Sequence, residues 1–486
     1  MINPELQTSL QGAAGPRRYW IRTFGCQQND HDSEIIAGLL EASGLVPAAS
    51  LEDCDLAILN SCSIRENADG RFYGHLGIVK AERERRPELL VAVCGCMPLI
   101  EEHVERIRRS YSFVDLVFGP EDIPRLPQLL RERLESGRKV REIDRASGII
   151  AEGLPVVRAR RFRALVTIMT GCDNYCSYCI VPYTRGRERS RDSEAILAEV
   201  RQLVSEGYGE VMLLGQNVNS WNRKRRPDST DPPGRDFAWL LEQVAATGIP
   251  RIRFMTSNPR DLSSGMLAVM ERHANIERHL HLPLQSGSDR VLAQMNRHYD
   301  RARYLAIVAE ARRRIPDIAF STDIIVGFPG ETEADFAETL SLVEEVAFDS
   351  AFLFQYSPRY GTPAALLARR IPPEIMRERF DRLLSLQNRL SEASNHRLVG
   401  RELSVLIEGA ADHRPGLLLG RSSSNHLVNF ALTPAIAREC GVDPGDSDRA
   451  GELLEGRFAR VRVEAARMLS TSGTALAVLP AGEGAP

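Results

Sequence analysis

Apolar and amphipathic stretches alternate along the amino-terminal quarter of the chain. The predicted strands cover residues 18–24, 56–60, 89–93 and 114–118, and they end at Gly25-Cys26, Ser61-Cys62, Cys94-Gly95-Cys96 and Gly119. Helical periodicity begins at about Asp32 and extends again over about 65–86. This alternation predicts a parallel sheet with intervening helices, whose ligands gather beyond the carboxyl ends of the strands.

The same alternation continues through the middle of the chain. Predicted strands cover residues 164–169, 210–214, 251–254, 319–326 and 350–354, and predicted helices include 193–206 and 301–313. Repeated β/α units of this kind are typical of a complete or partial (β/α) barrel, with its active site at the loops that follow the strands.

The pattern changes near Glu402 to short alternating strands separated by turns rich in Gly, Pro and Asp. These strands cover residues 403–407, 417–420, 426–430 and 458–463. They predict a small β-barrel, an architecture that often binds nucleic acid. Residues from about Ser470 to Pro486 are predicted to be a flexible tail.

The fold class is therefore α/β with three parts. We expect a parallel α/β domain at 16–150, a partial (β/α) barrel at 155–392 and a β-barrel at 395–466, in keeping with a length of 486 residues. A hydrophobic content of 43% with 26% charged residues is typical of a soluble globular protein. The sequence shows neither a secretory h-region nor an apolar run long enough to span a bilayer, so we expect a cytoplasmic protein without a membrane partner. A net charge of −3 gives no bulk attraction to nucleic acid.

Three of the nine cysteines lie within eight positions, as Cys172, Cys176 and Cys179. Thiols stay reduced in the cytosol, so this cluster indicates metal binding or catalysis rather than a disulfide. Three thiolates are one short of closing a tetrahedral metal site or a [4Fe–4S] cube, which leaves a place for a non-protein ligand. The alternative is a zinc knuckle or a plain ferredoxin-like cluster, but zinc would need a fourth ligand nearby and the next histidine is His273.

A second set of three cysteines follows predicted strand ends. Cys26, Cys62 and Cys96 each come just after a strand of the first sheet, which predicts a shared metal site at one edge. The alternative is three unrelated core cysteines, because free Cys is often buried. The other cysteines are predicted to be small core residues, although Cys94 could substitute as a ligand: Cys54, Cys94 and Cys440.

The cysteine loop, with Tyr178 directly before its last cysteine, resembles the signature of the radical S-adenosylmethionine enzymes. Nearly the whole chain resembles the methylthiotransferase family within that superfamily. The motifs that carry the resemblance are at 23–29, 60–66, 171–176, 180–191 and 214–220. The sequence Cys62-Ser63-Ile64-Arg65-Glu66 is similar to the motif found at this place in the branch of the family that acts on tRNA. The carboxy-terminal barrel resembles the TRAM domain of RNA-modifying enzymes. The chain departs from the family at Gln28, where Met is common, at Ser61, where Thr is common, and in a basic insert at 223–231.

The resemblance implies two [4Fe–4S] clusters. Cys172, Cys176 and Cys179 would hold the cluster that binds and reductively cleaves S-adenosylmethionine, and Cys26, Cys62 and Cys96 would hold an auxiliary cluster that carries the sulfur. The expected product is a 2-methylthio group on carbon 2 of N6-isopentenyladenosine at position 37 of tRNA, formed with two S-adenosylmethionine molecules. No catalytic residue beyond the clusters is expected, because this radical chemistry uses no acid/base pair.

Several polar residues at presumed strand ends are candidates for binding S-adenosylmethionine beside Tyr178, although each could equally be structural: Gln216, Gln285 and Asp323. The loop 327–331 is not a P-loop and is either a plain strand–helix turn or a lining of the cofactor pocket. The run Arg185, Arg187, Arg189 and Arg191 could bind cofactor carboxylate or tRNA phosphate, or be a solvated salt-bridged loop.

The expected partners are the anticodon stem-loop of tRNA, an electron donor and a sulfur or cluster donor protein, with the chain itself a monomer. One rival interpretation is a methylthiotransferase that acts on a protein side chain. Another is a non-enzymatic RNA-binding scaffold with iron–sulfur or zinc sites. Two open three-cysteine sites favour chemistry over a scaffold, because structural metal sites are closed.

Overall fold

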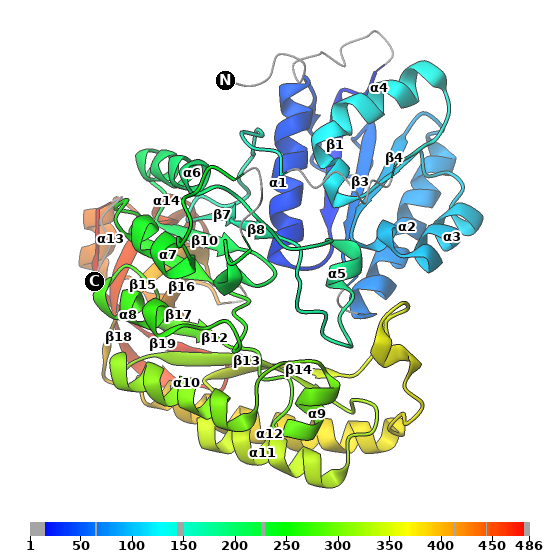
Figure 1. The fold of residues 1–486 in the computed structure, drawn as a ribbon. Helices are drawn as coiled ribbons and strands as arrows, with labels where there is room; N and C mark the ends of the chain where they lie inside the picture. Colours follow the sequence, from blue (N-terminus) through cyan, green and yellow to red (C-terminus); the bar gives the residue numbers. More distant parts are fainter. Residues whose placement is uncertain are drawn as a thin grey trace. The chain divides into compact units, whose positions relative to one another are not determined.

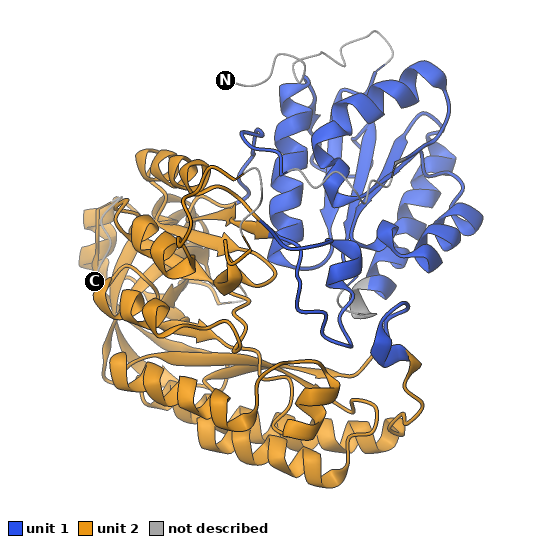
Figure 2. Cartoon of the chain, viewed as in Figure 1, with its two compact units in different colours: residues 1–159, 170–189, 358–365 blue, residues 160–169, 190–357, 366–486 orange. Residues whose placement is uncertain are grey.

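The computed structural model describes residues 15–63, 66–142, 150–224, 229–412, 414–443 and 445–480. The chain forms two compact units, and both are discontinuous in sequence (Figure 2). Unit 1 comprises residues 1–159, 170–189 and 358–365, and unit 2 comprises residues 160–169, 190–357 and 366–486. None of the described helices is long and apolar enough to cross a membrane.

Unit 1 contains a six-stranded parallel sheet in the order β2-β1-β3-β4-β5-β6, of which Figure 1 labels β1, β3 and β4. Its strands are β1 (Arg18–Thr23), β2 (Val46–Pro47), β3 (Leu56–Ser61), β4 (Leu90–Gly95), β5 (Leu116–Phe118) and β6 (Val140–Glu142). Every residue of β3 and β4 is buried, as expected for central strands of a parallel sheet covered on both faces.

Four helices cover the two faces of this sheet, and their bounds are α1 (Gln27–Ala42), α2 (Glu66–Arg85), α3 (Glu101–Ser110) and α4 (Leu126–Ser136). One apolar core joins Leu40 of α1 and Leu130 of α4 to Ile58 of β3. The other core lies on the opposite face and joins Leu76 of α2 and Ile107 of α3 to the sheet. Two short 3₁₀ helices, η2 (Met97–Leu99) and η3 (Pro120–Arg125), complete the connections.

The sequence pattern predicted the strands of unit 1 that carry a strong apolar run. It missed β2 and β6, which are only two and three residues long. Helix α1 begins at Gln27 rather than near Asp32, because Cys26 is extended and serves as its N-cap. The linker predicted around Ser147 to Pro155 lies partly outside the described residues, as do Ile64 and Arg65 of the tRNA-branch motif.

Unit 2 contains six parallel strands, in two sheets ordered β11-β10-β7 and β12-β13-β14. A single bridge between Ile252 and Ile276 connects β11 to the segment that leads into β12. The strands are β7 (Arg163–Thr167), β10 (Glu210–Leu214), β11 (Arg251–Phe254), β12 (His279–His281), β13 (Ala319–Val326) and β14 (Ser350–Gln355). This arrangement is the predicted partial (β/α) barrel.

The strands of the partial barrel alternate with helices (Figure 1). These are α6 (Ser193–Ser205), α7 (Phe237–Ala245), α8 (Ser264–Arg272), α9 (Asp289–Gln294), α10 (Arg301–Arg314), α11 (Glu333–Val346) and α12 (Pro373–His396). Of the shorter elements, η4 (Val218–Ser220) belongs to unit 2 and α5 (Val181–Thr184) to unit 1, whereas β8 (Met169–Thr170), β9 (Arg189–Ser190) and η5 (Pro363–Leu366) span the segment boundaries of the two units. The pattern missed β12, because its sequence His-Leu-His is short and mostly polar.

The carboxy-terminal part of unit 2 is a closed barrel in the order β15-β16-β17-β19-β18. Its elements are β15 (Glu402–Ala410), β16 (Leu418–Ser422), β17 (Leu427–Ala431), α13 (Pro434–Cys440), α14 (Ser447–Leu454), β18 (Phe458–Ala466) and β19 (Thr471–Val478). The expectation of a flexible tail from Ser470 is wrong for 471–478, because β19 closes the barrel. A Cβ at Gly473 would lie 1.9 Å from the carbonyl oxygen of Arg462, so the two backbones approach too closely for any side chain. Small residues in β19 hid this strand from the hydrophobic pattern.

Charged side chains are buried inside the partial barrel. The Nη2 atom of Arg253 lies 3.0 Å from Oε2 of Glu210 and 2.5 Å from Oε1 of Glu277. Burial raises the pKa of Glu277 to about 8. Burial would also raise the pKa of Glu210, but the adjacent Arg253 guanidinium outweighs it and lowers that pKa. Arg253 is therefore the cation that keeps Glu210 ionised in the interior.

Replacement of Arg253 by methionine is expected to destabilise the barrel by about 3–5 kcal/mol, because it leaves the Glu210 carboxylate buried without its cation. The loss is measured as the change in free energy in the denaturant-unfolding transition of the barrel. The matched control is Arg449→Met, which removes an exposed partner of Glu452 and is expected to change little. Equal effects of the two substitutions would contradict the role of Arg253.

Candidate functional site

Cys26, Cys62 and Cys96 lie at one edge of the sheet in unit 1. Cys62 directly follows β3, Cys96 directly follows β4, and Cys26 lies three positions beyond the end of β1. Because β1, β3 and β4 are neighbours in a parallel sheet, their carboxyl ends bring the three cysteines to the same edge. The predicted placement of these residues therefore matches the topology.

Two glycines permit the close approach of the cysteine turns. Gly25 has a φ of +134°, and a Cβ there would lie 2.3 Å from Cβ and 2.9 Å from Sγ of Cys62. Gly95 has a φ of +96°, and a Cβ there would lie 2.2 Å from the carbonyl oxygen of Ser61. Neither position accepts a side chain, so both glycines are needed to hold the cysteine turns together.

Two buried asparagines link the same turns by hydrogen bonds. Asn29 Nδ2 donates to Oδ1 of Asn60 at 3.0 Å and to the carbonyl oxygen of Ser61 at 2.8 Å. Asn60 Nδ2 donates in return to the carbonyl oxygen of Asn29 at 2.9 Å. These bonds fix the first turn of α1, which follows Cys26, to the end of β3, which precedes Cys62.

The three thiols have different electrostatic surroundings. A hydrogen bond from Cys62 lowers the pKa of Cys26 to about 6, against the opposing effect of burial, and the Arg185 guanidinium assists. Burial raises the pKa of Cys96, although Arg185 partly offsets it. A lowered thiol pKa favours the thiolate, which is the form that ligates metals.

The donor chemistry of this edge, which is three thiols, fits an iron–sulfur cluster. Within the described part of the chain, no three His, Cys, Asp or Glu side chains are grouped so as to hold one metal ion. A [4Fe–4S] cluster takes one thiolate at each corner iron, so its ligands are spread more widely than those of one ion. Three cysteines at one sheet edge are a suitable donor set for such a cluster.

The remaining cysteines belong to the protein interior. Cys94 lies within β4 in the apolar core, and burial raises its pKa well above the usual value. Cys54 donates to the carbonyl oxygen of Leu51 at 3.2 Å, and burial raises its pKa to about 11. Cys440 packs against the core of the carboxy-terminal barrel. These surroundings favour a structural role, including for Cys94, which the sequence left open as an alternative ligand.

The loop cysteines Cys172, Cys176 and Cys179, with Tyr178, lie in the segment 170–189, which belongs to unit 1. The backbone N–H of Cys172 donates to the carbonyl oxygen of Gly186 at 3.2 Å, which closes the loop. Gly171 has a φ of +75°, and a Cβ there would lie 2.0 Å from the carbonyl oxygen of Arg187. Cys172 and Cys176 are buried and Cys179 is half-buried, all as free cysteines.

The other candidate cofactor residues lie in unit 2. Gln216 is the second residue after β10, and Gln285 donates its backbone N–H to the carbonyl oxygen of Asp323 at 2.8 Å. Asp323 lies within β13 rather than at its end, and Nε2 of His281 is 3.4 Å from its Oδ2 atom. The Oε1 atoms of Gln216 and Gln285 are buried without a hydrogen-bond partner among the described residues. Such acceptors require a donor, and a bound ligand can supply it.

The arginine run after the cysteine loop is mostly neither solvated nor open to a ligand. Arg185 is buried and contacts Cys96 and Asp32, and Arg189 binds Glu121. Arg191 is also buried, where it donates to the carbonyl oxygen of Thr167 at 2.6 Å and to Glu199 at 2.9 Å. Arg187 is the exposed member of the run, and its Nη1 atom donates to the Tyr175 hydroxyl at 3.2 Å. The sequence pattern could not reveal these contacts, because they involve residues distant along the chain.

The loop 327–331 is held by protein contacts. The Glu331 carboxylate accepts from the backbone N–H of Gly327 at 3.0 Å and from Arg379 of α12 at 2.9 Å. Phe328 is fully buried. Of the two predicted roles, these contacts favour a plain strand–helix turn over a lining of the cofactor pocket. In the basic insert, Arg223 pairs with Asp261, whereas Arg225 and Arg226 lie outside the described residues.

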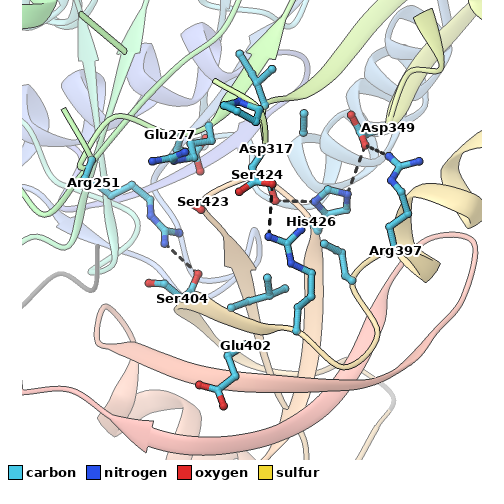
Figure 3. A pocket seen from close by; sticks show the side chains of 18 of the residues that line it. Arg251, Glu277, Asp317, Asp349, Arg397, Glu402, Ser404, Ser423, Ser424 and His426 are labelled. Carbon is cyan, nitrogen blue, oxygen red and sulfur yellow. Dashed lines mark hydrogen bonds and ion pairs between the residues drawn. The ribbon is translucent and has the colours of Figure 1, made fainter. Parts of the chain in front are cut away.

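A cavity of about 550 Å³ lies at the amino-terminal ends of the strands in unit 2, next to the carboxy-terminal barrel (Figure 3). Its charged groups largely bind one another. Arg397 lies 3.2 Å from Asp349, and Arg401 lies 3.5 Å from Asp317. The active sites of (β/α) barrels occupy the opposite, carboxyl ends of the strands, so this cavity is not the candidate cofactor site.

Comparison with protein families identifies both regions that contain a three-cysteine set. Residues 18–119, which include Cys26, Cys62 and Cys96, match the model of "Uncharacterized protein family UPF0004". Residues 166–343, which include Cys172, Cys176 and Cys179, match the model of the Radical SAM superfamily. The chain is 44% identical over 457 residues to the tRNA-2-methylthio-N(6)-dimethylallyladenosine synthase of Acetivibrio thermocellus, covering 94% of this chain and 90% of that protein. The chain belongs to the tRNA-2-methylthio-N(6)-dimethylallyladenosine synthase family.

Other comparisons agree with membership of this synthase family. The enzyme of the same name from Bacillus subtilis is 42% identical over 469 residues, which cover 96% of this chain and 88% of that protein. Among solved structures, the radical S-adenosylmethionine methyltransferase TsrM from Kitasatospora setae matches with a TM-score of 0.51 at 14% identity, covering 72% of this chain and 75% of TsrM. That match concerns the fold alone. The chain is accordingly an enzyme, and its cofactors are iron–sulfur clusters and S-adenosylmethionine.

Proposed function

We propose that this enzyme methylthiolates carbon 2 of N6-isopentenyladenosine at position 37 of tRNA, with two S-adenosylmethionine molecules consumed for each product. The observation that carries the proposal is the second three-cysteine set, at the shared edge of β1, β3 and β4. This set occurs in a chain that is 44% identical to a synthase named for that product. A radical enzyme with one cluster could activate a C–H bond, but transfer of sulfur needs a second site that supplies it.

We assign two [4Fe–4S] clusters to the six cysteines. Cys172, Cys176 and Cys179 would hold one cluster, and Cys26, Cys62 and Cys96 would hold the other, each with a fourth iron left open. When bound, the first cluster supplies the electron that cleaves S-adenosylmethionine, and the second supplies the sulfur. The lowered pKa of Cys26 and the glycine-permitted packing of Gly25 on Cys62 support the second assignment.

We assign four residues of the chain to S-adenosylmethionine: Tyr178, Gln216, Gln285 and Asp323. The buried Oε1 atoms of Gln216 and Gln285 would accept hydrogen bonds from amino or hydroxyl groups of the cofactor. Asp323, which His281 orients, would serve as a charged acceptor. No group of the chain is required to take or give a proton in the proposed reaction.

We further propose that the functional domains cover residues 16–150, 155–392 and 395–478, the last extended beyond the predicted boundary at 466 because β19 (Thr471–Val478) closes the barrel. That third domain, a closed TRAM-like barrel, would bind the anticodon stem-loop of tRNA. The partners would be an electron donor and a sulfur or cluster donor protein, and the chain would act as a monomer. Because the substrate is tRNA, the site of action would be the cytoplasm.

The test is expression of the chain in a bacterial strain that lacks 2-methylthio modification, followed by mass spectrometry of nucleosides from its tRNA. The intact chain is expected to restore 2-methylthio-N6-isopentenyladenosine. Cys176→Ala is expected to restore none, because it removes a cluster ligand. The matched control Cys440→Ala is expected to restore it, because that cysteine lies outside both sets. Unmodified tRNA together with a methylthiolated protein side chain would favour the rival substrate.

A further inference from the structure

Arg185 contacts a cysteine of the set at the sheet edge, although it belongs to the segment that carries the other set. It is the C-cap of α5, six positions after Cys179. Its Nε atom donates to Sγ of Cys96 at 3.2 Å, and its Nη2 atom donates to Oδ2 of Asp32 at 2.7 Å. Arg185 and Asp32 are both more than nine-tenths buried. Unit 1 contains all of these residues (Figure 2).

The carboxylate that binds Arg185 is Asp32, whose other oxygen accepts from Gln28 Nε2 at 3.4 Å. A guanidinium carries five N–H donors and is always charged, so its burial demands strong acceptors. A neutral thiol is a weak acceptor, whereas a thiolate bears a charge that pairs with the cation. The orientation of Nε toward Cys96 therefore places an N–H donor and a fixed positive charge at the sulfur of a proposed cluster ligand.

We infer that Arg185 is a positioning residue that donates a hydrogen bond to the ligating thiolate of Cys96 and thereby sets the reduction potential of the auxiliary cluster. The inference rests on the proposed function, because it requires a cluster on Cys26, Cys62 and Cys96. Reduction adds one negative charge to a cluster. A fixed cation and an N–H···S hydrogen bond stabilise that added charge, and hence raise the potential.

A purely structural ion pair between Arg185 and Asp32 is the competing explanation. An ion pair alone would not need the Nε–H group to be directed at sulfur while Nη2 binds the carboxylate. The planar fork of arginine serves both partners at once, whereas the point charge of lysine cannot reproduce this geometry. The two explanations differ in what they predict for Asp32, since its negative charge should lower the potential that Arg185 raises.

The test is a potentiometric titration of the full-length chain, monitored by electron paramagnetic resonance. The parent protein carries Cys172→Ala, Cys176→Ala and Cys179→Ala, so that only the auxiliary cluster contributes. In this parent, Arg185→Gln is expected to lower the ratio of reduced to oxidised cluster about tenfold at a fixed ambient potential, which is about 59 mV for one electron. Arg185→Lys is expected to give a smaller shift in the same direction, and Asp32→Asn a shift in the opposite direction.

The control is Arg449→Gln, which replaces an exposed arginine of α14 in unit 2. It is expected to leave the reduction potential unchanged. Shifts of opposite sign for the Arg185 and Asp32 variants would support the inference, because a general loss of packing has no reason to produce them. Unchanged potentials in variants that keep their iron would overturn it. If Arg185→Gln loses its iron, the reduction potentials of Arg185→Lys and Asp32→Asn test the inference by the same criteria. A parent protein without any iron would overturn the auxiliary-cluster assignment and the inference with it.

Discussion

A chain with Cys172, Cys176 and Cys179 all replaced by alanine is expected to bind about four irons after anaerobic reconstitution, whereas the unaltered chain binds about eight. The physical reason is that these thiolates would hold one cube, while the second set, at the edge of the sheet in unit 1, is left intact. Iron and acid-labile sulfide analysis provides the measurement. The same variant is expected to cleave no S-adenosylmethionine.

The control for this experiment is Cys440→Ala, which removes a thiol that packs against the carboxy-terminal barrel and should leave the iron content unchanged. Zinc in place of iron, or an unchanged iron content in the triple variant, would refute the assignment of the loop.

Cys62→Ala is expected to cleave S-adenosylmethionine and to form no methylthiolated product. The substitution removes a ligand of the proposed auxiliary cluster without touching the cysteine loop at 172–179. Alanine keeps the Cβ atom that packs beside Gly25, so the two turns should retain their packing. Incubation with the tRNA substrate, followed by chromatography of 5′-deoxyadenosine and of the tRNA nucleosides, measures both outcomes.

The matched control is Cys54→Ala, which removes a buried thiol from the apolar core of the same unit. That variant is expected to form product, since the Cys54 thiol donates to the backbone carbonyl of Leu51 and lies outside both three-cysteine sets. Normal product formation by Cys62→Ala would show that Cys62 is not a required ligand.

Sequence patterns predicted the fold where apolar runs were long. Strands β3, β10, β11 and β13 lie within one residue of their predicted bounds, because buried parallel strands carry continuous apolar residues. Strands β2, β6 and β12 have two or three residues, which is too short for any periodicity. Strand β19 was missed for another reason, since its small residues Thr, Ser, Gly and Ala show little hydrophobic contrast.

The candidate site was predictable to the extent that it depends on strand ends. Cys26, Cys62 and Cys96 were expected at one edge because parallel strands share their direction, and the sheet order confirms that edge. The burial of Arg185 was not predictable, since its contact with Cys96 joins residues 89 positions apart. The local composition around Arg185 resembles a solvated basic run, and only the folded chain shows that this arginine is buried.

The discontinuity of unit 1 has a consequence for how such enzymes can change. Asp32 and Cys96 lie in the amino-terminal part of the sequence, but their shared partner Arg185 follows the cysteine loop, beyond residue 159. A recombination event near residue 159 would join an amino-terminal part from one ancestor to an arginine from another. A chimaera joined at that point would therefore keep this contact only if its second part supplies an arginine at position 185.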